Sequence, residues 1–302
     1  YIPAALALIA ESHDASTRSR AVGAHQTGIY AGIILGGFCG YAAESPHVGW
    51  RRMFEISGVL GVLYALPLFL ALPRTPAPTP SLAPSAPHDS LLRTVRGLVR
   101  QPPFLLLAAY FTLPAMAGWI VRDWMPAVLK SEFGIGQGRA GVSATLYWMT
   151  ASVIGAFLGG WIADRWAQRN HRGRIYVSAI GVAATVVALL GVGYAPATGR
   201  LAIAVAFLVL FGLGWGVYDA NNMPILAQIL PARNRAAGYG CMNLVSIGCG
   251  GFADRWFGLL RDHHVPMPAI FGLFASLGML AIALVLALRP SQTERARASN
   301  PS

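Results

Sequence analysis

Asp219 is an acidic residue in a long apolar stretch, and it is the strongest candidate for chemistry in this sequence. On a helix, Trp215 and Asn222 share its face through their i−4 and i+3 spacing, and Tyr218 directly precedes it. An ionisable group in an apolar span is costly to keep, so such a group commonly binds a solute or takes up a proton. The alternative is an acid that hydrogen-bonds to a neighbouring helix and only fixes the packing.

Arg122 and Asp123 form a second candidate pair, near the end of another apolar stretch and between Trp119 and Trp124. In a gate, this ion pair would break and form again as the protein changes conformation. The alternative is an ordinary membrane-interface belt, in which aromatic and charged residues gather at the end of a spanning helix.

His25, Gln26 and Tyr30 lie close to the start of a glycine-rich apolar segment. A histidine in this position could carry a coupled proton, because the ordinary pKa of its imidazole is about 6.5. It could equally form a hydrogen bond close to the lipid headgroups.

Polar residues at helical spacing form two further stripes within apolar segments. The stripes comprise Ser143, Tyr147 and Thr150 in one segment, and Tyr239, Asn243 and Ser246 in the other. Polar stripes often only join helices by hydrogen bonds, but several that converge indicate a water-filled cavity. Tyr147 and Asn243 are therefore taken as candidates for a solute site.

The elements that position these residues are predicted to be transmembrane helices. Of 302 residues, 55% are hydrophobic and only 12% are charged, and the mean hydropathy is +0.53. A soluble domain carries about twice this charged fraction, and several apolar runs exceed the ~18 residues that predict a membrane span. The formal net charge of +11 comes mainly from arginines in loops, a pattern that anchors topology and predicts no nucleic-acid partner.

The sequence shows no pattern for a cofactor. Cys39, Cys241 and Cys249 all lie in apolar segments without metal-ligand spacing, so they are expected to be small buried residues. The glycine-rich segments lack the Lys-Ser/Thr pair of a phosphate-binding loop, which argues against an ATPase. A polytopic membrane enzyme is a remote alternative, for which His263-His264 is a weak basis.

A proline-rich stretch over residues 74–102 divides the chain, and most arginines fall where this stretch and alternate loops would be cytoplasmic. Before it we expect the end of a helix over residues 1–12 and helices over about 21–43 and 49–72. Within it, residues 91–99 predict a basic amphipathic helix at the inner membrane surface. Six further spans are expected at 103–129, 139–163, 175–195, 201–230, 235–259 and 267–288, before a disordered tail over 290–302.

Two motifs resemble those of a known family. Gly160-x-x-x-Asp164-Arg165 followed by Arg169 lies between two spans and is similar to the loop signature of the major facilitator superfamily, although Ala167 stands where the family has glycine. Arg18-Ser-Arg20-Ala21-Val22-Gly23 recurs as Arg233-Asn-Arg235-Ala236-Ala237-Gly238, and each copy opens a glycine-rich helix. This internal repeat fits the two parallel six-helix halves of the family.

The resemblance covers essentially the whole chain and implies an all-α membrane fold with two pseudo-symmetric halves. Residues 1–73 would be the C-terminal part of an incomplete first half, residues 74–102 a cytoplasmic linker and residues 103–289 the second half. Gly160, Asp164, Arg165, Arg169 and Arg235 would act in gating. Asp164 would face the N-terminal end of the helix that starts near Arg235 and stabilise the inwardly closed state.

The resemblance further implies a secondary active transporter that works by alternating access, and not an enzyme. We expect a multi-pass, monomeric protein of the plasma membrane, with the lipid bilayer, a small-molecule substrate and H⁺ as partners. The substrate is expected to be a small polar solute, either an organic anion or a sugar acid, moved by a proton symporter. The alternative is efflux of amphipathic drugs, which Trp215, Tyr218 and Trp119 would suit.

Overall fold

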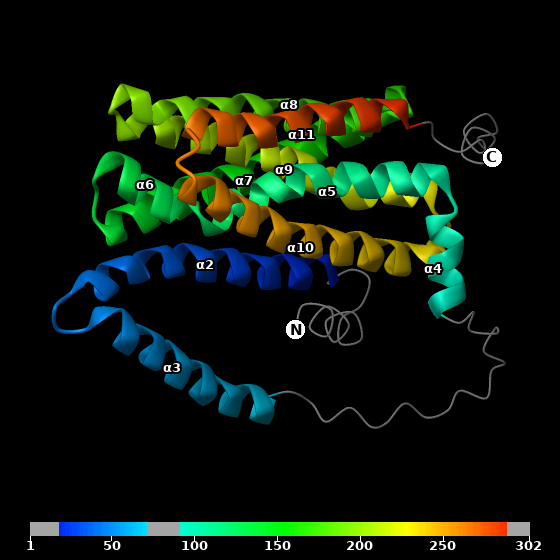
Figure 1. Cartoon of the computed structure of the whole chain (residues 1–302). Coiled ribbons are helices and arrows are strands. Elements are labelled where there is room, and N and C mark those ends of the chain that lie inside the picture. Colours follow the sequence, from blue (N-terminus) through cyan, green and yellow to red (C-terminus); the bar gives the residue numbers. More distant parts are fainter. Residues whose placement is uncertain (1–17, 72–90, 289–302) are drawn as a thin grey trace.

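The computed structural model describes residues 18–71 and 91–288, and every regular element within these two ranges is a helix. This confirms the all-α expectation. The helices are α2 (Arg18–Glu44), α3 (Gly49–Ala71), α4 (Leu91–Val99), α5 (Pro102–Asp123), α6 (Met125–Phe133), α7 (Gln137–Arg169), α8 (Gly173–Tyr194), the short 3₁₀ helix η1 (Ala195–Thr198), α9 (Leu201–Ile229), α10 (Ala232–Asp262) and α11 (Met267–Ala287) (Figure 1).

Six stretches of the described chain are long and apolar enough to cross a membrane. They correspond to α3, α5, α7, α8 with η1, α9 and α11. The outward faces of these helices carry large exposed apolar side chains, such as Phe69 on α3 and Phe157 on α7. Because such surfaces are stable in lipid and unfavourable in water, the chain is a multi-pass membrane protein.

Helices α5 to α11 pack into one bundle, with α9 between α7 and α8, and α11 against both α5 and α8 (Figure 1). Glycines allow the backbones to approach closely. A Cβ atom at Gly216 of α9 would collide with the carbonyl oxygen of Ser152 on α7, and one at Gly181 of α8 would lie 2.8 Å from the carbonyl oxygen of Gly214. Small residues at helix crossings are the usual means of packing in lipid.

The span expected over 103–129 is divided at Trp124 into α5 and α6. Pro126 explains the division, because it has no backbone N–H to donate to the carbonyl of Arg122 one turn earlier. Helix α6 then ends at Gly134, whose φ of +60° is readily adopted only by glycine. Pro224, by contrast, lies within α9, which continues through it as one helix.

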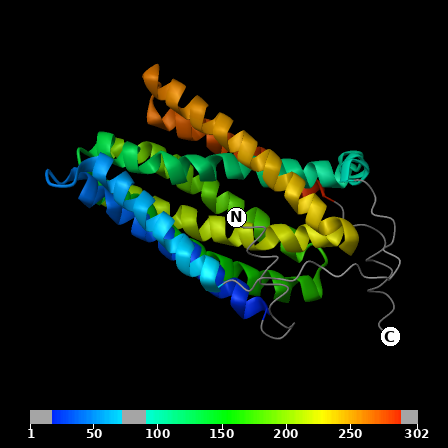
Figure 2. The ribbon, with the colours of Figure 1, turned by 90° about the horizontal axis from the view of Figure 1, so that it is seen from below.

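Helices α2 and α3 form a hairpin beside the bundle, and α2 runs antiparallel to α7 (Figures 1 and 2). The closest approach joins the end of α2 to the start of α7, where a Cβ at Gly40 would lie 2.7 Å from the carbonyl oxygen of Gln137. Gly28, Gly32 and Gly36 have the spacing of a packing face, but a Cβ at any of these positions would meet no atom within 4 Å.

The two copies of the repeated motif open α2 and α10, and these starts point toward the same end of the molecule, where α4 also lies (Figure 1). We call this the inner end and the opposite end the outer end. The expected amphipathic helix is present as α4, whose Leu98 is fully buried against the bundle. Most of the expected linker and the expected tail lie outside the described residues.

Candidate functional site

Asp219 lies on α9, ten residues from the inner end of that helix, which places it roughly 15 Å deep at the usual helical rise. Its side chain is exposed, whereas both Tyr218 and Asn222 are only 1% exposed. Helix α9 therefore holds two of the predicted polar residues in its packed faces and presents the acid to an accessible space.

Tyr218 is held by a buried network between three helices. Its hydroxyl donates a 2.5 Å hydrogen bond to the carbonyl oxygen of Phe111 on α5, and its ring packs edge-on against Tyr110. The Tyr110 and Ser178 hydroxyls are hydrogen-bonded at 2.6 Å, which ties α5 to α8. Because the Tyr218 hydroxyl is used inside the bundle, this residue positions α9 and is not available to a solute.

Asn222 differs from Tyr218 because neither its Nδ2 nor its Oδ1 forms a hydrogen bond of good geometry, although both atoms are buried. The amide adjoins the Asp219 carboxylate and the Tyr218 phenol and interacts with both groups.

Tyr239 of α10 and Tyr30 of α2 complete the surroundings of Asp219. Tyr239 lies within electrostatic range of both Asp219 and Tyr30, and its ring packs 6.0 Å from that of Phe111. Asn243, one turn further along α10, donates a 3.1 Å hydrogen bond to the Tyr239 carbonyl oxygen. The structure thus brings Asp219, Asn222, Asn243 and Tyr30 into one region. Tyr239 was not among the predicted site residues, although its place in the same stripe as Asn243 could have shown it.

Other predicted residues lie elsewhere. Tyr147 is 43% exposed and shares a face of α7 with the exposed apolar residues Ile154 and Leu158, whereas Gly155 and Gly159 face α9. His25 is partly buried on α2, and the side chain of Gln26 lies outside the described residues.

The Arg122–Asp123 pair lies at the outer end of α5. The guanidinium of Arg122 is 3.8 Å from the Asp123 carboxylate and 5.1 Å from the Trp119 ring, and both charged side chains are about half exposed. This is the geometry of the local interface pair that was the alternative to a gate. The gating role of the pair stays a prediction.

Asp164 has a different partner from the one expected. Its carboxylate accepts a 2.7 Å hydrogen bond from the guanidinium of Arg174 at the start of α8, and not from the start of α10. Arg235 of α10 donates to the carbonyl oxygens of Leu230 and Ala227, so it caps the C-terminal end of α9. A Cβ at Gly160 would meet no atom within 4 Å.

Glu44 forms a contact at the outer end that the sequence does not indicate. Its carboxylate accepts hydrogen bonds from the backbone N–H groups of Gln137 and, at 3.0 Å, of Gly138, the first residues of α7. The N-cap position of α7 is Gly136, which has no side chain to cap the helix. The hydrogen bond from the N–H of Gly138 and, as the second-largest cause, that from Gln137 lower the pKa of the Glu44 carboxyl. Glu44 therefore joins the α2–α3 hairpin to the bundle as a carboxylate at a helix N-terminus.

A membrane-spanning bundle with an accessible acid beside a buried amide has the architecture of a membrane transporter. No group of three or more metal-ligating side chains occurs within residues 18–71 and 91–288.

Comparison with known sequences agrees with this class. The sequence profile of the Major Facilitator Superfamily matches residues 1–253. The chain belongs to this family.

Individual relatives are distant. The chain is 29% identical to an MFS-type efflux pump of Mycolicibacterium smegmatis over 68% of this chain and 46% of that protein. It is 26% identical to a cis,cis-muconate transport protein of Acinetobacter baylyi over 92% of this chain and 63% of that protein. The chain thus spans between 46% and 63% of the length of these curated relatives.

A solved structure with a similar fold is a bacterial homologue of the human lysosomal transporter Spinster, in an inward-facing and unoccupied conformation. The TM-score is 0.67 at 19% sequence identity, over 95% of this chain and 71% of that one.

Proposed function

We propose that this chain is part of a proton-coupled secondary transporter that moves a small organic anion across the plasma membrane, with Asp219 as the proton-coupling acid. The α2–α3 hairpin would belong to the first six-helix half and α5 to α11 would form the second. A monomer would suffice, because the site lies between the halves of one chain.

The observation that carries this proposal is the position of Asp219. Its carboxyl group is accessible although it lies deep along α9, and it is next to the buried amide of Asn222. An ionised acid would repel an anionic substrate, so binding of the anion would favour uptake of a proton by Asp219. This linkage makes the two ligands enter together, which is the requirement for symport.

Alternating access needs a site that is closed on one side at a time. At the outer end, Glu44 binds the start of α7 and Gly40 lies close to Gln137, and these contacts would close that side. At the inner end, Gly160 on the same helix has open space beside it. This arrangement supports an inward-open state, in which the substrate would exchange with the cytoplasm.

The similarity to a muconate transport protein over 92% of this chain supports an organic anion as substrate. The alternative substrate class is an amphipathic drug, because one relative is named as an efflux pump. One structural observation favours it: Phe211 and Trp215 stack at 5.9 Å, and Trp215 is also 5.4 Å from Tyr218. Partly exposed Trp215 would present an aromatic surface to such a drug.

Uptake into proteoliposomes tests both possibilities. The full-length protein is reconstituted, and accumulation of labelled dicarboxylates, sugar acids and cationic dyes is measured with and without an imposed pH gradient. We expect a dicarboxylate or sugar acid to accumulate at least about tenfold more with the gradient, which is about 1.4 kcal/mol of coupling. Asp219→Asn should abolish this gradient dependence and leave exchange of substrate against substrate intact.

Asp262→Asn is the matched control, because it makes the same acid-to-amide change at the exposed end of α10. It should transport as the unchanged protein does. Accumulation of cationic dyes, and not of anions, would favour the efflux alternative. Gradient-driven uptake that persists in Asp219→Asn would exclude Asp219 as the coupling acid.

A further inference from the structure

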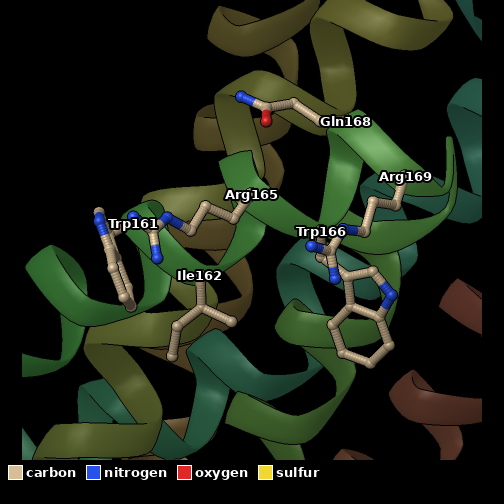
Figure 3. A pocket seen from close by; sticks show the side chains of 6 residues that line it. All are labelled: Trp161, Ile162, Arg165, Trp166, Gln168 and Arg169. Atoms are coloured by element: carbon tan, nitrogen blue, oxygen red, sulfur yellow. The ribbon is translucent and has the colours of Figure 1, made fainter.

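A groove of about 540 Å³ lies on the last turns of α7 at the inner end, away from the Asp219 region. It is lined by Trp161, Ile162, Arg165, Trp166, Gln168 and Arg169 (Figure 3). The guanidinium of Arg165 lies 4.1 Å from the centre of the Trp161 ring, and Trp166 and Arg169 line the same groove one turn further along the helix. Two arginines and two tryptophans thus line one groove, and one of the arginines packs on a tryptophan ring.

The positive charge of this groove is not neutralised by the protein. Arg165 and Arg169 are exposed and, among the described side chains, neither forms an ion pair with a carboxylate. The neighbouring carboxylate of Asp164 is already paired with Arg174 at 2.7 Å. Like charges at i and i+4 on a helix repel each other, so an anion between the two guanidinium groups would relieve an unfavourable contact.

The apolar surface that continues from the groove distinguishes a lipid from a soluble anion. Ile154, Phe157 and Leu158 lie on the preceding turns of the same helix, and between 46% and 77% of each side chain is exposed. Phe157 is one turn from Trp161, and Leu158 is one turn from Ile162. A ligand that uses both surfaces needs an anionic group at one end and a hydrocarbon chain at the other.

The position of the groove relative to the bilayer points to the same ligand. The arginine-rich loop after α7 marks this end as cytoplasmic, and tryptophans are enriched at the level of the lipid headgroups. The cytoplasmic leaflet carries anionic lipids, which attract basic side chains close to its surface.

We propose that this groove is a binding site for an anionic phospholipid of the cytoplasmic leaflet. The phosphate group lies between Arg165 and Arg169, with the Gln168 amide as a further donor. An acyl chain follows Phe157 and its apolar neighbours along α7. This site depends on the membrane orientation of the chain and not on the role of Asp219.

Native mass spectrometry of the full-length protein tests the proposal, with phosphatidylglycerol and phosphatidylcholine of identical acyl chains as probes. Phosphatidylglycerol should bind in preference to phosphatidylcholine. The double substitution Arg165→Gln and Arg169→Gln should weaken phosphatidylglycerol binding by roughly 25-fold, because each basic residue near an anionic lipid contributes about fivefold. Substitution of both arginines by lysine should restore most of the binding, since the charge is retained.

Arg139→Gln with Arg200→Gln is the matched control, because it removes two exposed arginines from the outer end. This control should bind phosphatidylglycerol as tightly as the unchanged protein does. Equal binding by the Arg165/Arg169 double glutamine variant, or equal binding of both lipids by the unchanged protein, would overturn the proposal. Glycerol phosphate that competes as well as the lipid would also overturn it, because the occupant would then be a soluble anion.

Discussion

Substitution of Gly40 by alanine tests whether close contact between α2 and α7 keeps the outer end closed. A Cβ at this position would lie 2.7 Å from the carbonyl oxygen of Gln137 and 2.9 Å from the Cα of Gly138. Ordinary contact begins at 3.4 Å, so the helices must separate by roughly 0.5–0.7 Å. Overpacking of this kind costs about 1–3 kcal/mol. If only the outer-closed state bears this cost, the ratio of closed to open molecules falls by about 5- to 150-fold.

The shift in population can be measured by double electron–electron resonance. Spin labels at His47, in the α2–α3 loop, and at Glu132, in α6, report on the outer end, since both positions are exposed. The three native cysteines are first replaced by serine. Gly40→Ala should convert a single short distance into a distribution with a longer component.

Gly36→Ala is the matched control, because it makes the same change one turn earlier in α2, where a Cβ would meet nothing within 4 Å. Both substitutions improve helix propensity equally, so any difference between them reports on contact with α7. If Gly40→Ala and Gly36→Ala give the same distance distribution, the close approach to Gln137 does not hold the outer end closed.

Two further predictions concern individual hydrogen bonds. The contact between Glu44 and the start of α7 lowers the pKa of the Glu44 carboxyl. The ionised carboxylate therefore stabilises this contact above the ordinary pKa of glutamate, and the stabilisation is lost as the pH falls through the lowered pKa. The spin-label distance at the outer end should therefore not change between about pH 8 and 6 but lengthen below about pH 4. The substitution Glu44→Gln should lengthen this distance at every pH. If the distance in Glu44→Gln equals that in the unchanged protein, this prediction is wrong. Tyr218→Phe removes one buried hydrogen bond to Phe111, worth about 0.6–1.7 kcal/mol in a membrane protein. It should lower thermal stability slightly and leave the apparent KM within about twofold, whereas a large rise in KM would show that the hydroxyl contacts substrate.

The sequence predicted the helices well because lipid imposes a strong rule on hydropathy and length. It indicated Asp219 as a candidate because an acid in an apolar span is rare, and the role of this residue stays a prediction. It could not predict that Tyr218 would turn its hydroxyl toward Phe111, since that depends on which face of α9 meets α5. The signal for the division at Trp124 was present in Pro126 but was outweighed by the apolar run around it.

Contacts between distant segments were the least predictable part. Glu44 and Gln137 are 93 residues apart, and one partner is a backbone N–H, which leaves no mark on residue type. The same limit explains the different partner of Asp164, because a motif shows that a carboxylate needs a donor but not which helix supplies it.

The antiparallel register of α2 and α7 predicts where Asp164 would bind when the inner end closes. Where a residue of α2 faces a residue of α7, their two residue numbers add up to about 180. The pairs Glu44 with Gly138 and Gly37 with Gly141 are examples. Continued along both helices, this register places Gly160 level with Arg20, and Asp164 at the N-terminal end of α2. Glu44 caps α7 at the outer end, so Asp164 would cap α2 at the inner end in the same way.

Cross-linking between cysteines at positions 20 and 160 tests this reciprocal arrangement in the full-length protein. We expect the cross-link to be weak in the unchanged background, since Gly160 faces open space, and to increase when Glu44→Gln releases the outer end. A second cysteine pair, at positions 160 and 235, represents the partner that the sequence first indicated. If that pair cross-links in response to Glu44→Gln and the first does not, α10 and not α2 closes the inner end. The expected result follows from packing, because α2 lies along α7 whereas α10 lies along α5.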